Sequence, residues 1–194
     1  GLTTGIEFIF STHGALTQSL LLSSGSLSQS FWDLTLQPQS NGNTKAQFTL
    51  NYLEPAKATA SLSGISQHTH ILQSDALPIV DTNNRKLWHI LIQRNGTLPT
   101  ASYELKVGSR YDTGGNLRDS IQYYSSASLV VTGGNAHANF TSSGIPAVSS
   151  DNLYVGSNFT GSLTEFRTYG SASMSDYNFH THIFEPKSVV GPKI

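Results

Sequence analysis

The chain has 194 residues, of which 37% are hydrophobic and 12% are charged, so it is long enough to bury the core of one domain. Its 11 Lys and Arg nearly balance its 12 Asp and Glu, and this net charge of −1 argues against a nucleic-acid-binding protein, which usually carries a basic patch. The lack of cysteine excludes disulfides and thiolate metal sites, and no apolar run approaches the roughly 20 residues that span a bilayer. We therefore expect neither a nucleic-acid partner nor membrane insertion.

Alternating apolar and polar residues, the pattern of a β-strand, dominate the first half of the chain. The first such run is residues 6–10, and longer runs follow at 31–36 and 47–53. Asn41 and Gly42 separate the two longer runs and are typical of a hairpin turn, so we expect these two runs to pair. Further strands are predicted at residues 20–22, 58–62, 68–72 and 77–80.

The strongest strand pattern lies in the second half of the chain, at residues 87–93. Both of its faces are largely apolar, so we expect a central strand that is covered on both sides. Trp88 is predicted to lie in the core, as is Trp32 in an earlier run, and His89 is interpreted as a packed strand residue and not a catalytic base. Further strands are predicted at 103–107, 121–124, 129–132, 153–155 and 163–169. About a dozen strands with closely spaced turns predict an all-β sandwich or barrel.

One short helix is predicted near the C-terminus. Ser173 and Asp176 form a weak capping box at its start, in which Asp replaces the usual Glu, and Pro186 ends the segment. Its apolar residues are expected to face the core, because a short surface helix is stabilised mainly by packing one face against the protein. The residues expected there are Met174, Tyr177 and Phe184.

The most specific motif in the chain covers residues 151–175. A strand ends in a hydrophobic residue and Gly156, a short loop leads to Phe159 and Gly161, and a strand of Glu-hydrophobic-Arg-hydrophobic type begins at Glu165. A Met-Ser helix start follows. This stretch resembles the closing segment of laminin-G-like domains, in the concanavalin A-like lectin/glucanase superfamily. The two glycines suit tight turns with positive φ or a close backbone approach.

Other segments match the strand order of the same family. They are residues 4–10, which resemble an early inner-sheet strand, 84–94, which resemble the central Trp-His strand, and 103–107, which resemble the strand after it. Residues 182–191 are similar to the tail that follows laminin-G-like modules in large structural proteins of tailed phages and other viruses. The resemblance therefore covers nearly the whole chain and points to a virion protein.

The resemblance implies that residues 1–194 form a single laminin-G-like domain, a concanavalin A-like jelly-roll sandwich of two antiparallel sheets with one short helix near the C-terminus. We expect the domain to be a segment of a longer chain, because the sequence starts at Gly1 and lacks the family's usual first strand. Animal secreted members usually carry a disulfide near the C-terminus, which this chain lacks. A virion or extracellular location is therefore expected, and an animal matrix origin is disfavoured.

The carboxylates argue against an enzyme. Glucanases of this superfamily place their catalytic carboxylates on one strand as Glu-x-Asp-x-x-Glu, which puts the first two on one face. The chain has five Glu, and none has an Asp two residues further on. We interpret Glu165 and Arg167 as a structural ion pair, and we expect no catalytic residue.

Two sets of residues are candidates for binding. Exposed aromatic rings next to Asn or Asp suit stacking on sugars, and the candidate ligand-binding residues are Tyr111, Asp112, Asn116, Tyr123 and Tyr124. A competing interpretation makes one residue of the pair Tyr123 and Tyr124 a core residue and the other a surface residue. The resemblance also makes calcium a candidate ligand at the sandwich rim, with oxygens from Asp81, Asn83 and Asp112, or from the neighbouring Asn84 and Asn116. Asp and Asn are equally the ordinary residues of turns.

Two functions are compatible with these patterns. The first is a non-enzymatic structural or adhesion module of a virion surface or tail, or of another extracellular assembly, which contacts neighbouring protein subunits or host glycans. The alternative is a carbohydrate-binding module of a secreted protein, with calcium as a candidate cofactor. Glycan titration with and without calcium distinguishes the two.

Overall fold

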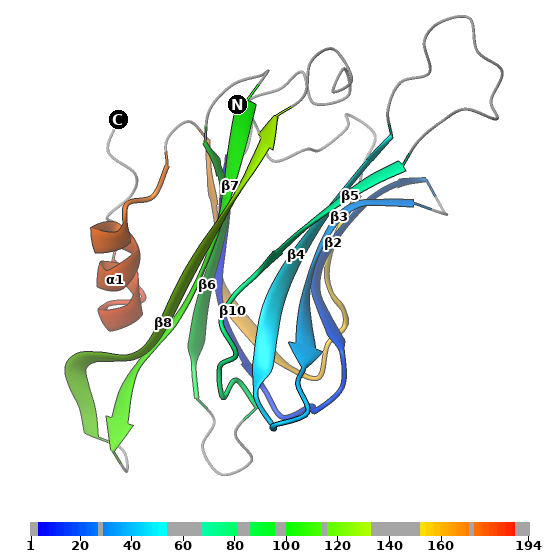
Figure 1. The fold of residues 1–194 in the computed structure, drawn as a ribbon. Coiled ribbons are helices and arrows are strands. Elements are labelled where there is room, and N and C mark those ends of the chain that lie inside the picture. The colour runs from blue at the N-terminus through cyan, green and yellow to red at the C-terminus, as the bar shows by residue number, and fades with distance from the viewer. Residues whose placement is uncertain are drawn as a thin grey trace, which may run out of the picture.

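The computed structural model describes residues 4–26, 29–53, 67–80, 86–95, 100–113, 116–132, 152–170 and 173–188. These residues form ten strands and one helix (Figure 1). The strands are β1 (Gly5–Thr12), β2 (Gln18–Ser26), β3 (Gln29–Pro38), β4 (Thr44–Leu53), β5 (Gln67–Gln73), β6 (Trp88–Asn95), β7 (Thr100–Thr113), β8 (Asn116–Thr132), β9 (Asn152–Asn158) and β10 (Gly161–Tyr169), and the helix is α1 (Asp176–Phe184).

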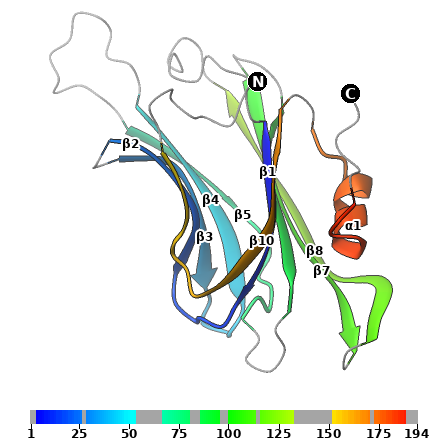
Figure 2. The same ribbon diagram turned by 180° about the vertical axis from the view of Figure 1, so that it is seen from behind.

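The strands form two antiparallel sheets of five strands each, which pack face to face. We name the first sheet A, with strand order β10-β1-β6-β7-β8, and the second sheet B, with order β5-β4-β3-β2-β9. The helix α1 lies on the face of sheet A that points away from sheet B (Figure 2). The predicted all-β sandwich of two antiparallel sheets, with one short helix near the C-terminus, is confirmed.

The core between the sheets follows the period-two alternation of the strands. Phe8 of β1 and Trp88 of β6 project from sheet A, and Trp32 and Phe48 project from sheet B. The two tryptophans are buried, as predicted. Strand β6 lies in the middle of sheet A and is buried on both faces, because sheet B covers one and α1 covers the other. The prediction of a central, covered strand is therefore confirmed.

Three glycines have the roles expected of them. Gly42 has φ of 81° in the turn between β3 and β4, and Gly156 has φ of 64° in β9. Gly161 begins β10 where a Cβ atom would lie 2.0 Å from the carbonyl oxygen of Ser11, so any side chain here would displace the backbone. Positive φ and close approach are both conditions that favour glycine.

Some strand boundaries differ from the predicted ones. The strands expected at 121–124 and 129–132 are a single strand, β8, which pairs with β7 along almost its whole length. Asp112 and Asn116, which the sequence makes candidates for ligand binding, both belong to the β7–β8 ladder. Residues 77–80 do not form a strand, and Leu77 makes only an isolated bridge with Thr44. The strand predicted at 58–62 lies outside the described residues.

The helix begins two residues later than predicted. Ser175, and not Ser173, is the N-cap, and its hydroxyl oxygen accepts a hydrogen bond from the backbone N–H of Asn178. The changed position turns Tyr177 to solvent, where it is 78% exposed, so its predicted place in the core is wrong. Met174 is buried as predicted, and the helix ends before Pro186. No helix in the described part of the chain is long and apolar enough to cross a membrane.

Candidate functional site

Several of the predicted binding residues lie beyond what the structure describes. The backbone of Asp112 pairs with that of Leu117, and Tyr111 precedes it in β7, while Asn116 begins β8. The side chains at these three predicted positions are not described. Asp81, Asn83 and Asn84 lie outside the described residues altogether. The calcium site therefore stays a prediction.

Tyr123 and Tyr124 face opposite sides of β8. The ring of Tyr123 packs 5.7 Å from that of Trp88 on the core side, with the ammonium group of Lys86 4.4 Å above it. The ring of Tyr124 packs against the helix, 4.6 Å from His180. One sugar ring therefore cannot stack on both tyrosines, and glycan binding by either one stays a prediction.

A buried polar cluster that the sequence patterns did not reveal lies between α1 and sheet A. The Nδ1 atom of His182 in α1 lies 2.9 and 2.8 Å from the two carboxylate oxygens of Glu7 in β1. The hydroxyl of Tyr169 in β10 donates a hydrogen bond to the same carboxylate. Burial, and then the hydrogen bond with Glu7, raises the pKa of Tyr169 above its ordinary value. Glu7 and His182 are both buried, so this cluster fixes the helix to the sheet and presents no surface to a substrate.

The start of the helix is held by side chains from two central strands of sheet A. Gln93 of β6 pairs with the backbone of Met174 twice, because its Oε1 accepts from the N–H at 2.6 Å and its Nε2 donates to the carbonyl at 3.0 Å. Lys106 of β7 also donates to that carbonyl and forms an ion pair with Asp176 at 2.7 Å. The hydrogen bond from Lys106 lowers the pKa of Asp176.

Two arginines hold the end of the helix. The Nη1 atom of Arg110 in β7 donates to the carbonyl of Phe184 at 2.8 Å, and Arg167 in β10 donates to the carbonyl of Pro186. Cations near a helix C-terminus are favourable because the last carbonyl groups carry partial negative charge. Arg110 and Arg167 thus complete a set of polar contacts that runs from one end of α1 to the other. We call this set the helix clamp, and its side chains from sheet A and α1 are Glu7, Gln93, Lys106, Arg110, Arg167, Tyr169 and His182.

His89 lies within this clamp on the helix-facing side of β6. It is buried, as predicted for a packed residue, and its Nδ1 atom has no hydrogen-bond partner among the described residues. Burial, together with the neighbouring His182, Arg167 and Arg110, lowers the pKa of His89 to about 3. The imidazole is therefore neutral near pH 7 and poorly suited to exchange protons with a substrate.

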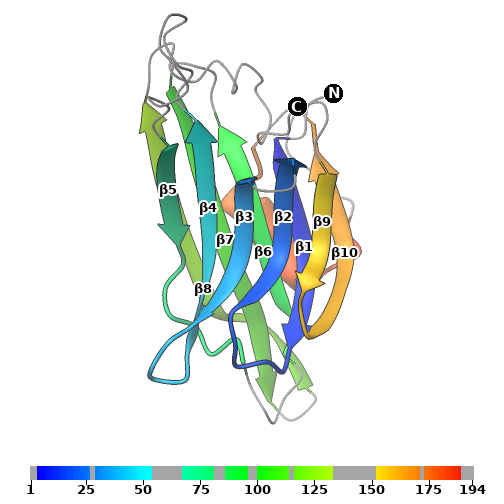
Figure 3. The ribbon, with the colours of Figure 1, turned by 90° about the vertical axis from the view of Figure 1, so that its right-hand side faces the viewer.

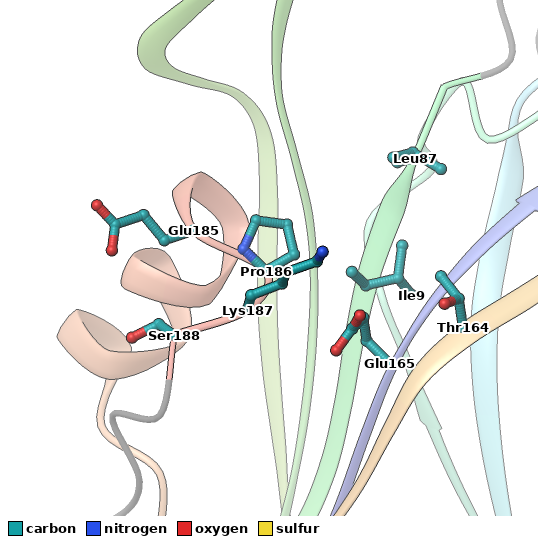
Figure 4. A pocket seen from close by; sticks show the side chains of 8 residues that line it. All are labelled: Ile9, Leu87, Thr164, Glu165, Glu185, Pro186, Lys187 and Ser188. Atoms are coloured by element: carbon teal, nitrogen blue, oxygen red, sulfur yellow. The ribbon is translucent and has the colours of Figure 1, made fainter.

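A cavity of about 590 Å³ lies beside the end of α1, with an apolar floor that includes Ile9 and Leu87 (Figure 4). Glu165 lines it from a bulge in β10, where its φ is 50° and its carboxylate lies 3.5 Å from Arg167. The predicted structural pair of Glu165 and Arg167 is therefore confirmed. Glu185, the other acidic residue at the rim, has its side chain turned away from the cavity. In a glycosidase the two catalytic carboxylates face each other across the scissile bond. The carboxylates of Glu165 and Glu185 do not face each other.

Exposed apolar side chains gather along one side of the sandwich, where β9 ends sheet B and β10 ends sheet A (Figure 3). Leu153, Tyr154 and Val155 of β9 are 42%, 45% and 49% exposed, and Phe166 of β10 is 42% exposed. We call these four residues the apolar edge. In the sequence, the apolar edge is signalled by the uncharged segment of β9. This segment is predicted as a strand, but the sequence does not predict that it forms a contact surface.

Comparisons with known proteins give no further identification. No protein-family model matches the chain. No curated protein matches it either. Within the described ranges, no three His, Asp or Glu side chains come together as a metal site. The laminin-G-like resemblance thus stays a prediction that is based on the motifs alone.

Proposed function

We propose that this chain is a non-enzymatic structural or adhesion module of a virion surface or tail, or of another extracellular assembly. The apolar edge is the observation that carries this proposal. Three consecutive half-exposed apolar side chains on a terminal strand, with an exposed phenylalanine on the neighbouring terminal strand, are a typical surface for contact with another protein.

The helix clamp supports the same proposal. Glu7 and His182 of the clamp are buried and bonded to each other, and the hydroxyl of Tyr169 donates a hydrogen bond to the same carboxylate. General acid–base catalysis needs a group within reach of a substrate proton. A clamp that attaches a helix to a sheet is a structural use of these residues, and it makes the sandwich a rigid scaffold.

The low charge of the chain fits contacts with neighbouring subunits. Charged residues are 12% of the sequence, and the described side chains of the apolar edge include no charged group. Apolar and aromatic residues are enriched in the centres of protein interfaces, where charged residues are depleted. Host glycans are the second class of contact in this proposal, and the half-exposed ring of Tyr154 is suited to stacking on a sugar.

The test is photo-cross-linking in the native assembly. A photoreactive phenylalanine analogue replaces Phe166 of the apolar edge, and the same analogue replaces Tyr177 as a matched control. Tyr177 is an exposed aromatic residue on α1, which lies on the outer face of sheet A and is not part of the apolar edge (Figure 2). We expect cross-links to a neighbouring protein subunit from position 166 and none from position 177.

Two results would overturn the proposal. Equal or absent cross-linking at the two positions would remove the apolar edge as a contact surface. Glycoside hydrolysis by the purified chain would show an enzyme. Glycan binding measured with and without calcium separates the two kinds of contact, because a carbohydrate-binding module predicts saturable binding by the isolated chain, whereas subunit contacts do not.

A further inference from the structure

The terminal strands β8, β9 and β10 differ in how well they are protected from pairing with another strand. An exposed sheet edge offers unpaired backbone N–H and C=O groups, and proteins usually protect such edges with charges, bulges or polar residues. Strand β10 is protected by the bulge at Glu165 and by the ion pair of Glu165 with Arg167. On β8, Val130 is 58% exposed, but the described exposed residues next to it on the same face, Ser126 and Ser128, are polar.

Strand β9 is less protected, because its bulge lies between Val155 and Asn158, beyond the three apolar residues 153–155, which pair regularly with β2. Its sequence, Asn152–Asn158, contains no charged residue and no proline. It is the terminal strand of sheet B, and the structure assigns it only one ladder partner, β2, among the described residues. Its three consecutive apolar residues are each more than two-fifths exposed. The edge of β9 is therefore better suited to receive another strand than the edges of β8 and β10.

The register with β2 defines the two faces of β9. Val155 lies opposite the buried Leu21, and Tyr154 lies opposite Leu22. Opposite residues share a face in an antiparallel pair, so Val155 and Leu153 point toward the inside of the sandwich, and Tyr154 points outward. The apolar side chains at this edge are thus arranged as the next layer of the core, with no described strand beyond them.

We propose that β9 pairs with β9 of a second copy of this chain, antiparallel and about a two-fold axis at Tyr154. This inference rests on the proposed function and names the partner at the apolar edge. A two-fold axis at Tyr154 brings Leu153 of each copy opposite Val155 of the other on the inner face, and it brings the two tyrosines together on the outer face. Each apolar side chain then meets an apolar side chain, and no charge is buried.

The symmetry makes the edge complementary to itself. Cross-strand pairs of aromatic and β-branched residues are among the favourable ones in sheets. The two five-stranded sheets B would join into one sheet of about ten strands, which is within the usual range for open sheets. A pairing through β10 would have the Glu165 bulge in the middle of its ladder, whereas the bulge of β9 lies after the three apolar residues.

The test measures molar mass by light scattering over a range of concentrations. We expect a dimer of twice 20.9 kDa that dissociates on dilution. Val155→Lys should give the monomer, because it places a charge in the new interface. Val130→Lys is the matched control, since it adds the same charge to an exposed valine on a different edge strand, and it should leave the dimer intact.

A cysteine cross-link provides a second readout that does not depend on how Val155→Lys folds. The chain has no cysteine of its own, so Tyr154→Cys introduces a single thiol. Directly opposite residues in an antiparallel pair have Cα atoms about 4.5–5.5 Å apart, which a disulfide can bridge. We expect Tyr154→Cys to form a covalent dimer on mild oxidation and the control, Tyr177→Cys, to remain monomeric at the same concentration, although Tyr177 is the more exposed of the two.

A monomer at every concentration would overturn the proposal, and so would a dimer that survives Val155→Lys and fails to cross-link through position 154. If the chain is monomeric but position 166 still cross-links to a different subunit in the native assembly, the proposed pairing of two β9 strands is wrong and the proposed function stands. If neither experiment detects a contact at this edge, both proposals fail.

Discussion

The two faces of sheet A use neighbouring residues of the same strands in different ways. On the inner face, residues such as Phe8 and Ile90 pack into the apolar core between the sheets. On the outer face, Glu7 and His89 alternate with them and lie in the polar clamp under α1. The inner face is thus held by burial of apolar area, whereas the outer face combines a smaller apolar cluster of Leu91, Met174, Phe179 and Ile183 with specific hydrogen bonds. Substitutions on the two faces should therefore differ in size and in which element they loosen.

The largest effect is expected on the inner face. Trp88→Ala removes a fully buried indole from the centre of the core, and the lost burial and the resulting cavity should lower the free energy of unfolding by about 4 kcal/mol. Urea unfolding followed by circular dichroism measures this change. The neighbouring Leu87 is half-exposed, so Leu87→Ala should cost less than about 1 kcal/mol. Equal losses for the two variants would contradict the assignment of the faces.

A smaller and more local effect is expected in the clamp. Glu7→Gln keeps the side-chain size and removes the carboxylate that His182 and Tyr169 share, which should lower the free energy of unfolding by about 2–3 kcal/mol. Hydrogen exchange should accelerate in α1 before it accelerates in the strands. Glu185→Gln is the control at an exposed glutamate and should have almost no effect. Loosening of the whole sandwich without a preference for α1 would show that Glu7 does not act mainly on the helix.

The clamp also predicts a dependence on pH. The pKa of His89 falls from 6.5 to about 3 on folding, so the unfolded chain binds more protons between these two values. The resulting stability is complete above pH 6.5 and decreases as the pH falls toward 3. This contribution should decrease by about 2 kcal/mol between pH 7 and pH 5, at about 1.4 kcal/mol per pH unit below 6.5.

Urea unfolding of the wild type and of His89→Gln at pH 7 and pH 5 tests this dependence. Relative to the wild type, the free energy of unfolding of His89→Gln should be higher at pH 5 than at pH 7. His13→Gln, at an exposed histidine, serves as the control and should follow the wild type. A difference that stays constant between the two pH values would mean that His89 is not buried in the neutral form.

The smallest effect distinguishes the predicted start of the helix from the observed one. Ser175→Ala removes the hydroxyl that accepts the hydrogen bond from Asn178, and it should cost about 1 kcal/mol. Ser173→Ala changes the residue that the sequence pattern favoured as the cap, and it should cost almost nothing. Thermal unfolding of the two variants measures the difference. A larger loss for Ser173→Ala would restore the predicted cap.

The sequence predicted the inner face better than the outer one, and the reason is the range of the interactions. Alternation within a strand identified Trp88 as a core residue, and local turn chemistry identified Gly42. The bond between Glu7 and His182 joins residues that are 175 positions apart, so no local pattern contains it. The same limit explains Tyr177, because a cap displaced by two residues changes which side of a short helix faces the sheet.

The apolar edge was harder to predict for a second reason, which is the order of the strands in the sheet. The position of β9 at the end of its sheet depends on the order of all the strands, and a sequence of alternating residues does not specify that order. Leu153 and Val155 were consequently predicted as strand residues, without the exposure that makes them candidates for an interface.

Amide hydrogen exchange in the native assembly, compared with the isolated chain at low concentration, tests most directly whether the apolar edge is a contact surface. We expect the backbone amides of Asn152–Asn158 to exchange faster in the isolated chain and to become protected in the assembly, whereas those of α1 should exchange alike in both. The result that would contradict it is unchanged exchange in β9 together with new protection elsewhere on the molecule. The contact surface would then lie away from the apolar edge.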